Sequence, residues 1–583
     1  MTSKTPKFDA ALDAILGNLS PHERMCKWAD LSPYCTKEFS ITPEDIKFYK
    51  KLRVPPPTLC PTCRRMRRLA ASFLLRFYKT KCVAPGHIES TISIIPPDSP
   101  FKIYDWEYYR TYEWDPFSFG ISPDSSRSFF DLFWDFRKEV PQPAIVRDPA
   151  NIDSDYTMLG RNLKRGYFVA AGWNSERVYY STSIFKHSED IMDSNMVTTG
   201  SHCYEANFSR DIQNTDFIYF SNDCYSCRFM YDSKNCHDCF GCVNLRNRSY
   251  CFFNEQLAKD EYEKRVASLN LGKRSELLKI KERFWDLVKK EPIRALRNEN
   301  AINSVGSFIV NSKNCYEVYG AEHCENIRYA DITVGNKDSM DYAVSGGSEL
   351  LYETVGIGSQ ASNVKFSFGS KFITDSEFLI NCKLSNNCFA CIGLENQSYC
   401  ILNRKYEPAE YFRIVDEIKT AMLERGEYGE FFPLKFSSYA YRDSTAGMVF
   451  PLTKEEMNSL GITIFKEGDE DIPHDGPALL KGAEIPDDIR DVTDSILEKT
   501  LICSLTQRPF RIIADELEFY RRKQLPLPTI HPNERIKQRY LLANPYRLYD
   551  EKCDKCGKKT KSMYKKSDGF HPYCEDCYRG EVV

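Results

Sequence analysis

Two regions of the chain, about 160 to 255 and about 305 to 403, alternate short runs of Val, Ile, Tyr, Phe and Cys with the turn formers Asn, Asp, Ser and Gly. Cysteines mark a period of twelve residues within them, at Cys224 and Cys236, at Cys227, Cys239 and Cys251, and at Cys388 and Cys400. A unit of twelve residues cannot bury its own apolar face, so neighbouring units must stack to complete a core. The pattern predicts a β-solenoid of the parallel β-helix kind.

Both regions end alike, in CFGCVNLRNRSYCFFNEQ from Cys239 to Gln256 and in CFACIGLENQSYCILNRK from Cys388 to Lys405. A stretch with helical periodicity follows each of them, as in LLKIKERFWDLVKK and PAEYFRIVDEIKTAML. We expect these helices to cap or flank the solenoid and to protect its open edges from further strand pairing.

The two ends of the chain are copies of one module. Residues Phe48 to Cys82 align without a gap with Phe519 to Cys553, so that FYKKLRVPPPTLCPTCRRMRR returns as FYRRKQLPLPTIHPNERIKQR. Each copy combines a proline-rich lead-in, Cys or His ligand candidates and a basic helix. We therefore predict a mainly β, multidomain protein with duplicated zinc-ribbon-like modules at both termini, around a β-solenoid core with interspersed helices.

These patterns divide the chain into seven expected segments. They are an N-terminal zinc module with an aromatic extension (1–150), a first solenoid segment (151–256), a helical insertion (257–304), a second solenoid segment (305–405), a helical or irregular cap (406–465), an acidic linker (466–495) and a C-terminal zinc ribbon (496–583).

Composition limits the function classes. The 583 residues exceed the usual size of one hydrophobic core, and the net charge of -3 gives no global field for nucleic acid or membrane. The N-terminal sequence lacks the features of a signal peptide, and no run of eighteen apolar residues occurs. We expect a soluble cytoplasmic protein with no membrane contact, in which the 23 cysteines are metal ligands or buried thiols.

The clearest chemical signal is at the C-terminus, where Cys553-x2-Cys556 and Cys574-x2-Cys577 form two CxxC knuckles. Four thiolates at this spacing can close a tetrahedron around Zn²⁺ and leave no open coordination position. The sequence therefore predicts a structural zinc site.

A second zinc site is predicted from Cys26, Cys35, Cys60 and Cys63, of which only the CPTC knuckle has ideal spacing. In the C-terminal copy His531 matches Cys60, and Cys503 can match Cys35 only through a three-residue gap. Each module is therefore expected to hold one zinc ion, two in all. Whether Cys503 and His531 retain a metal stays open at this point.

Basic side chains follow both lead-ins. They are Arg64, Arg65, Arg67 and Arg68 in the first copy and Arg535, Lys537 and Arg539 in the second. A zinc-braced basic helix can neutralise phosphates, which makes RNA or a ribonucleoprotein the preferred partner. A solvated face balanced by acidic neighbours is the equally weighted alternative.

Two further interpretations compete. The run Cys236-x2-Cys239-x2-Cys242 superficially has iron–sulfur spacing, but the twelve-residue repeat explains it more simply as stacked small apolar side chains. Solenoids can also carry paired carboxylates that cleave polysaccharides, with Asp216, Asp223, Asp331 and Asp341 as candidates here, although Asp in such a repeat is more often a turn residue.

Taken together, PPPTLCPTCRRMRR, CFGCVNLRN with FFNEQ, YGEFFPL with FPLTKEE, and the terminal FYRRKQLPLPTIHP resemble an uncharacterised family of large zinc-ribbon proteins from small-genome candidate-phyla bacteria. The resemblance covers nearly the whole chain and implies architecture and metal rather than a reaction. It departs between Met66 and Lys81, where ASFLLRFY replaces a more polar run.

The expected function is a zinc-binding, non-enzymatic scaffold whose basic modules contact RNA or a ribonucleoprotein. A scaffold for protein partners without nucleic acid is the first alternative, and a carbohydrate-active solenoid enzyme is the second.

Overall fold

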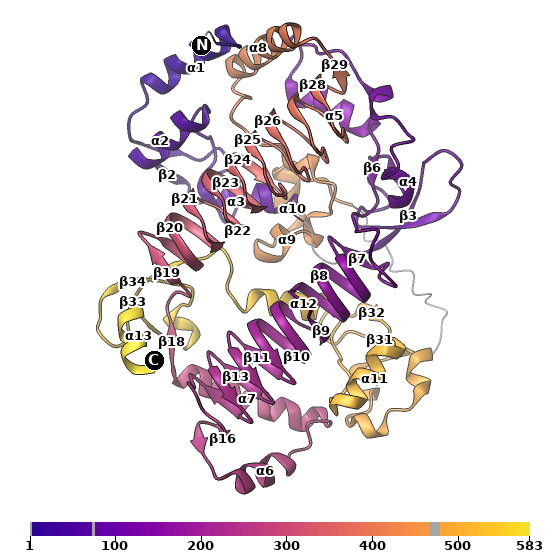
Figure 1. Cartoon of the computed structure of the whole chain (residues 1–583), viewed down its shortest axis with the longest axis vertical. Helices are drawn as coiled ribbons and strands as arrows, with labels where there is room; N and C mark the ends of the chain where they lie inside the picture. Colours follow the sequence, from indigo (N-terminus) through magenta and orange to yellow (C-terminus); the bar gives the residue numbers. More distant parts are fainter. Residues whose placement is uncertain (1–2, 73–75, 466–478, 583) are drawn as a thin grey trace. The chain divides into compact units, whose positions relative to one another are not determined.

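A computed structural model describes residues 3–72, 76–465 and 479–582 of the chain (Figure 1). It is a multidomain protein of mixed α and β structure with two compact units. Unit 1 combines Met1–Ile145 with Arg297–Glu467, and unit 2 combines Val146–Leu296 with Gly468–Val583. The N-terminal module thus shares a unit with the second repeat region, and the C-terminal module shares a unit with the first.

The repeat region of each unit forms an eleven-stranded sheet, called here the first stack in unit 2 and the second stack in unit 1. The first stack contains β7 (Thr157–Met158), β8 (Arg161–Phe185), β9 (Glu189–Met192), β10 (Asn195–Gln213), β11 (Asp216–Tyr219), β12 (Asn222–Tyr225), β13 (Arg228–Tyr231), β14 (Lys234–His237), β15 (Phe240–Val243), β16 (Cys251–Phe252) and β17 (Glu255–Gln256). The second contains β19 (Glu299–Ile302), β20 (Val305–Glu322), β21 (Glu325–Arg328), β22 (Asp331–Val334), β23 (Lys337–Gly346), β24 (Glu349–Val355), β25 (Ser362–Lys365), β26 (Thr374–Glu377), β27 (Asn386–Phe389), β28 (Ser398–Ile401) and β29 (Arg404–Lys405).

Apart from the last pair in each stack, the strands pair in parallel, mostly with a residue twelve positions further along the chain. Cys224 lies opposite Cys236 in the first stack, and Cys388 lies opposite Cys400 in the second. The twelve-residue period predicted from the sequence is therefore the offset between paired residues of neighbouring strands. The offset between paired residues is larger in a few coils, as where Glu349 pairs with Ser362, thirteen positions later.

A shorter period of three residues lies within each coil of twelve. Every third residue has a positive φ, as at Asp211, Asn214, Phe217 and Phe220, so each coil has four corners. The residue after each corner points inward, and Ile212 and the others at these positions are buried. Left-handed backbone costs about 1–2 kcal/mol for an ordinary residue, so stacking must offset this cost along the whole chain.

Serines bridge successive coils inside the first stack. Ser221 Oγ donates to the carbonyl of Tyr219 at 2.9 Å and accepts the amide of Ser233 at 3.0 Å. Ser209 Oγ accepts the amide of Ser221 in the same way at 3.2 Å. Because these groups are buried, each bond satisfies an amide that would otherwise cost about 1–3 kcal/mol. Polar inward residues therefore belong to the core.

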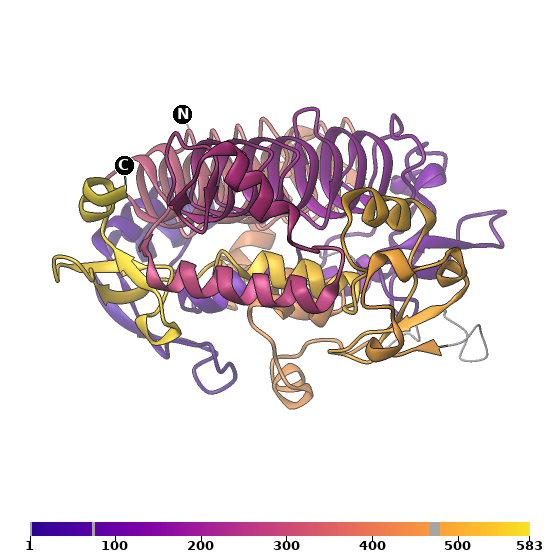
Figure 2. The same ribbon diagram turned by 90° about the horizontal axis from the view of Figure 1, so that it is seen from below.

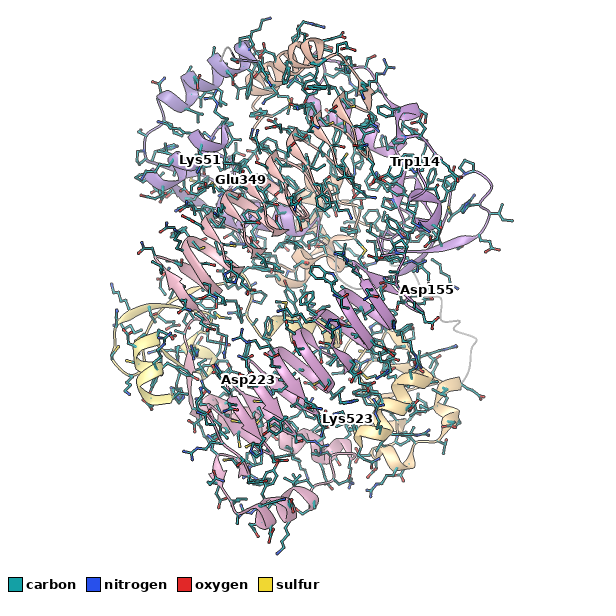
Figure 3. All side chains as sticks on the ribbon, in the orientation of Figure 1. Lys51, Trp114, Asp155, Asp223, Glu349 and Lys523 are labelled. Atoms are coloured by element: carbon teal, nitrogen blue, oxygen red, sulfur yellow. The ribbon has the colours of Figure 1, made fainter. Side chains whose placement is uncertain are left out.

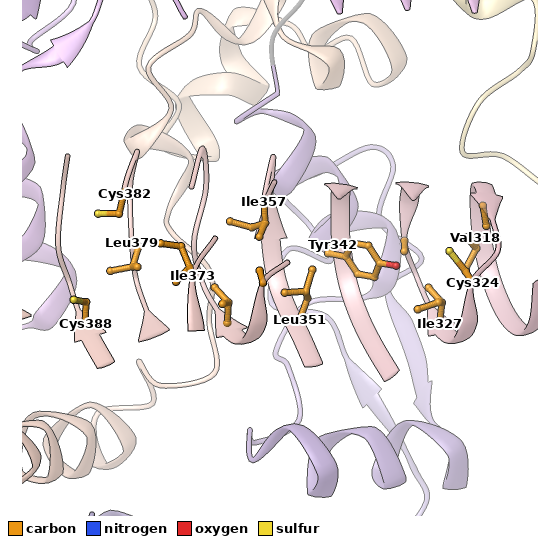
Figure 4. Close-up of a cluster of buried hydrophobic side chains, with 14 of the residues drawn as sticks. Val318, Cys324, Ile327, Tyr342, Leu351, Ile357, Ile373, Leu379, Cys382 and Cys388 are labelled. Atoms are coloured by element: carbon orange, nitrogen blue, oxygen red, sulfur yellow. The ribbon is translucent and has the colours of Figure 1, made fainter. Parts of the chain in front are cut away.

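The remaining inward positions carry small or branched apolar side chains. In the second stack they form one continuous cluster that includes Cys324, Ile327, Leu351, Leu379 and Cys388 (Figure 4). A comparable cluster runs through the first stack. The apolar core of each unit thus extends along its coils.

Both stacks end in a reversed strand and a helix. β17 pairs antiparallel with β16, and β29 pairs antiparallel with β28. The helices that follow are α6 (Lys259–Ala267) and α7 (Arg274–Lys290) in unit 2, and α8 (Pro408–Glu424), α9 (Thr445–Val449) and α10 (Lys454–Ser459) in unit 1. Figure 2 shows α7 alongside the coils, where the ring of Phe284 contacts Tyr219 and Phe229.

The terminal modules have matching elements. The N-terminal module contains α1 (Pro6–Gly17), β1 (His22–Met25), β2 (Glu38–Ile41), α2 (Pro43–Leu52), α3 (Pro61–Leu69), β3 (Tyr78–Lys81), β4 (Ser90–Ser93), β5 (Ile103–Tyr104), α4 (Trp106–Tyr109), α5 (Phe129–Glu139) and β6 (Gln142–Pro143). The C-terminal module contains β30 (Leu479–Leu480), β31 (Thr500–Ile502), β32 (Pro509–Phe510), α11 (Ala514–Lys523), α12 (Pro532–Leu541), β33 (Tyr549–Lys552), β34 (Lys559–Ser562), β35 (His571–Tyr573) and α13 (Glu575–Val582), and β35 pairs with β18 (Pro292–Arg294).

Part of the predicted acidic linker, residues 466–478, lies outside the described residues. Among the residues that the structure describes, no helix is both long enough and apolar enough to cross a membrane.

Candidate metal centres

The first metal centre lies in the N-terminal module. Cys26 follows β1, Cys35 lies in the loop before β2, and Cys60 and Cys63 lie at the start of α3. One ligand atom of each cysteine lies within 4.8 Å of the others, and the sulfurs of Cys35 and Cys60 are 3.9 Å apart. The amide of Cys60 donates to Cys26 Sγ at 3.2 Å. The four predicted ligands therefore meet at one point.

The second metal centre lies in the C-terminal module. Cys553 and Cys556 lie in the turn between β33 and β34, while Cys574 and Cys577 lie at the start of α13. Their ligand atoms also lie within 4.8 Å of one another, and the sulfurs of Cys556 and Cys574 are 3.8 Å apart. Gly557, with a φ of 72°, provides the left-handed residue that the turn after Cys556 requires.

Both quartets fit zinc. Four thiolates at about 2.3 Å from one Zn²⁺ ion lie about 3.8 Å from each other in a tetrahedron, which matches the sulfur separations in both centres. The cysteines of both quartets are free rather than disulfide-bonded. A closed set of four protein ligands leaves no position for substrate, so both centres are compatible with structural metal ions.

Backbone amides favour the thiolate form of one ligand of the second centre, Cys553. Burial raises the pKa of Cys553, but amides including those of Cys556 and Cys574 outweigh burial and bring this pKa to about 6. The amide of Cys574 donates to Cys553 Sγ at 3.3 Å. The thiolate is the form that binds metal, so these hydrogen bonds favour the state of Cys553 that can coordinate zinc.

Each module also carries a degenerate copy of the other module's centre. The amide of Asp105 donates to Cys82 Sγ at 3.2 Å, just as the amide of Cys574 donates to Cys553 Sγ. This bond places Asp105 at the position of Cys574, two residues later than the ungapped alignment does. Cys82 thus occupies the place of Cys553, and among the described residues it belongs to no group of three or more metal ligands.

The degenerate copy in the C-terminal module contains Cys503 and His531. The amide of His531 donates to Cys503 Sγ at 3.2 Å, and the amide of Cys60 makes the same bond to Cys26 Sγ. Cys503 therefore corresponds to Cys26, which corrects its tentative match to Cys35. Among the described residues, Cys503 and His531 belong to no group of three or more ligands that could hold a metal.

The arginines of α3 face the second stack. The Nε atom of Arg64 and the Nη1 atom of Arg68 contact the two carboxylate oxygens of Asp341 at 3.0 and 2.9 Å. Arg65 contacts Asp331 at 3.1 Å. Arg67 contacts Glu353 at 3.1 Å and Glu430 at 2.7 Å. None of the four arginine side chains is more than 6% exposed.

The second copy repeats this arrangement with the first stack. Arg535 and Arg539 of α12 both contact Asp193, Arg539 at 3.0 Å. The backbone contacts also agree, because Arg68 donates to the carbonyl of Tyr329 and Arg539 donates to the carbonyl of Tyr180. The duplicated module therefore binds its stack through the same buried contact in both units.

This burial corrects the expected role of these side chains. Arg64, Arg65, Arg67, Arg68, Arg535 and Arg539 are ion-paired in the interior of their units and do not present a phosphate-binding face. Lys537 is half-buried on α12. The sequence indicates the positive charge but not its partners, because the partner carboxylates lie far along the chain.

The cysteines inside the stacks have a structural explanation. Cys236, Cys239 and Cys242 follow three successive corners of one coil, and their sulfurs contact the carbonyls of residues 234, 237 and 240, each at 3.3 Å. In the described part of the chain, they join no metal-binding group. Their CxxCxxC spacing is therefore the three-residue period of the coil, and an iron–sulfur cluster gains no support.

The candidate catalytic carboxylates are also accounted for. Asp331 and Asp341 are paired with arginines as described, and Asp216 is buried against Lys523 of α11 at 2.8 Å. Asp223 is an exposed corner residue with a φ of 53° (both Asp223 and Lys523 are labelled in Figure 3). These four residues therefore offer no acid and base facing one substrate.

Glu516 is a fully buried carboxyl group in unit 2. Burial raises the pKa of Glu516 from 4.5 to about 7, although nearby Arg535 lowers it. Tyr180 donates to this carboxyl at 2.9 Å, Tyr520 is within 3.3 Å, and Asp193 is a further neighbouring charge. The folded state therefore holds this proton more tightly than the unfolded state.

We expect the stabilising effect of this proton to be complete below pH 4.5 and to disappear as pH rises to about 7. Relative to Glu516→Gln, the wild-type protein should lose about 3 kcal/mol over that range. Urea unfolding at pH 5 and pH 8 measures the difference. Glu518→Gln, on the exposed side of the same helix, should follow the wild type. Parallel pH profiles for wild type and Glu516→Gln would contradict the assignment.

Comparison with known protein families found no match, and neither did comparison with the curated proteins. The protein contains two tetracysteine clusters, and each lies in a candidate zinc-binding module.

Proposed function

We propose that the protein is a zinc-braced, non-enzymatic scaffold in which each stack is a β-solenoid that holds one terminal module in place. Zinc organises the module, and buried ion pairs attach the module to the solenoid. The exposed surfaces of the modules and solenoids then present binding sites in fixed geometry. We also propose that the chain is related to the zinc-ribbon family that its terminal motifs resemble.

The duplicated contact between two arginines and one aspartate supports this proposal most directly. Arg64 and Arg68 share Asp341, while Arg535 and Arg539 share Asp193. Separating such a buried pair leaves an uncompensated charge, which costs about 3–5 kcal/mol when one partner is removed, so the pairs favour a single position of the module on its stack. A protein whose modules only needed to fold could have used apolar side chains at these positions.

The test is to purify the full chain under reducing conditions without nuclease, and to measure zinc per chain and the macromolecules that accompany it. Two zinc ions with a stoichiometric RNA or protein partner would support the scaffold. Zinc removal should make both modules sensitive to protease while the stacks stay resistant, because the apolar core of each stack contains no ligand cysteine.

Loss of the stacks together with the metal would overturn the division of roles. So would turnover of a polysaccharide by the purified protein, which would revive the enzyme alternative. A nuclease-insensitive protein partner would favour the scaffold without nucleic acid.

A further inference from the structure

The hairpin of β33 and β34 has an uneven charge distribution. Lys552 and Lys559 lie directly opposite each other in its antiparallel register, and Lys558 immediately precedes Lys559. All three side chains are exposed. Directly paired residues on such a hairpin have Cβ atoms about 4.5–5.5 Å apart, so two like charges there are destabilising. We call these three residues the lysine tip.

The neighbouring carboxylates are already used by other groups. Asp550 contacts Lys561 at 2.7 Å, and Glu581 contacts Lys555 at 2.7 Å. Asp554 contacts Lys566. Within the described chain, the lysine tip has no ion-pair partner.

The N-terminal copy of the hairpin lacks the doubled charge. Lys81 corresponds to Lys552, but the residue opposite Lys81 is Ser90. That copy is also the one whose ribbon site has lost its cysteine ligands except Cys82. The like-charge pair therefore occurs on the hairpin that keeps its full set of metal ligands, and not on its degenerate copy.

The surroundings favour a polyanion over a protein surface. Among the described residues 542–582, no large apolar side chain is exposed. Protein interfaces rely on aromatic or aliphatic anchors, whereas cationic side chains can contact phosphates without such anchors. The Cys553 and Cys556 knuckle joins the two strands and fixes the tip in position.

We propose that the lysine tip binds the phosphodiester backbone of nucleic acid. This inference rests on the proposed scaffold function and assigns one of its binding surfaces. The three ammonium groups contact successive phosphates without reading sequence. About three neutralised phosphates predict that the logarithm of the affinity falls with the logarithm of salt concentration with a slope of about -2.

The test uses the zinc-loaded full chain and a labelled twenty-nucleotide polyuridine RNA, with polythymidine DNA and polyglutamate as separate probes. The triple variant Lys552→Gln, Lys558→Gln, Lys559→Gln should reduce the salt slope by about two and weaken binding at least tenfold at low salt. The matched control Lys555→Gln, Lys561→Gln, Lys566→Gln makes the same change in charge at ion-paired positions and should retain most of the binding. Zinc content should stay at two per chain in both.

Equal binding of DNA and RNA supports a backbone contact, and a preference for either polymer identifies the natural ligand. Equal RNA affinity for the wild type and the lysine-tip variant would overturn the proposal. Binding of polyglutamate without RNA would also overturn it, in favour of an acidic protein. In both cases two retained zinc ions would leave the scaffold proposal intact, because that proposal fails on zinc content and module attachment instead.

Discussion

Replacing Cys574 with Ser is expected to halve the zinc content, from two ions per chain to one, and to unfold the C-terminal ribbon locally. Cys574 is one of four ligands that converge within 4.8 Å, and the ribbon around them has few other buried groups. Structural zinc contributes on the order of 10–16 kcal/mol in small zinc domains, which far exceeds what a short hairpin and one helix supply. Plasma mass spectrometry measures the metal, and hydrogen exchange measures residues 549–582.

The chain provides its own control for this experiment. Cys82 occupies the place of Cys553 in the degenerate copy, and its sulfur accepts a hydrogen bond from a backbone amide in the same way. Cys82→Ser should therefore keep both zinc ions and leave hydrogen exchange in the ribbon unchanged. If Cys574→Ser kept two zinc ions and its ribbon stayed protected, the four-cysteine assignment would be wrong.

Ligand spacing predicted the metal centres well because the requirement is local. A CxxC pair can be recognised from four residues, and a tetrahedral site needs only two such pairs or their equivalent. The Cys26 and Cys35 pair departs from that spacing, yet both converge with Cys60 and Cys63 because the β1–β2 hairpin brings them there. Cys503 lies in a shorter hairpin than Cys26, so the spacing along the chain does not show that the two cysteines correspond.

The stacks were predicted by their twelve-residue period but not by their three-residue period. Inward positions are occupied by Ser221, Thr215 and Cys224 as well as by Ile218. The inward positions therefore cannot be recognised from the hydrophobicity of the sequence. Hydrogen bonds between coils make serine acceptable inside. Every third residue also adopts a left-handed conformation, including Phe217, which propensity rules would not assign to a corner.

The burial of the arginines and their ion-pair partners could not have been predicted from local sequence. Four positive charges on nine residues of α3 are typical of a nucleic-acid contact. Only the fold shows that four carboxylates neutralise them, those of Asp331, Asp341, Glu353 and Glu430. For the lysine tip, in contrast, the fold shows that the charges lack ion-pair partners among the described residues. Its charges are ordinary for a zinc ribbon in sequence, and only the register shows that two of them face each other.

Asp341→Asn is expected to destabilise unit 1 by about 3 kcal/mol, because it removes the closer of the two carboxylates that the buried guanidinium groups of Arg64 and Arg68 share. The other, Glu353, lies 3.9 and 3.5 Å from them and also pairs with Arg67. The matched control is Asp223→Asn, which makes the same change at an exposed corner. Both aspartates have positive φ, 56° and 53°, and asparagine tolerates that conformation, so the backbone cost is equal. Urea unfolding followed by circular dichroism measures the difference.

Local measurements separate attachment from metal binding. Asp341→Asn should increase hydrogen exchange in α3 while zinc stays at two per chain, because Asp341 is not a metal ligand. Asp193→Asn should produce the corresponding effect in α12 and leave α3 protected, since Asp193 pairs with Arg535 and Arg539. If Asp341→Asn and Asp223→Asn unfolded at the same urea concentration, the buried ion pairs would not be what holds the module on its stack. Surface contacts alone would then have to bear that role, and the argument for a rigidly attached module would fail.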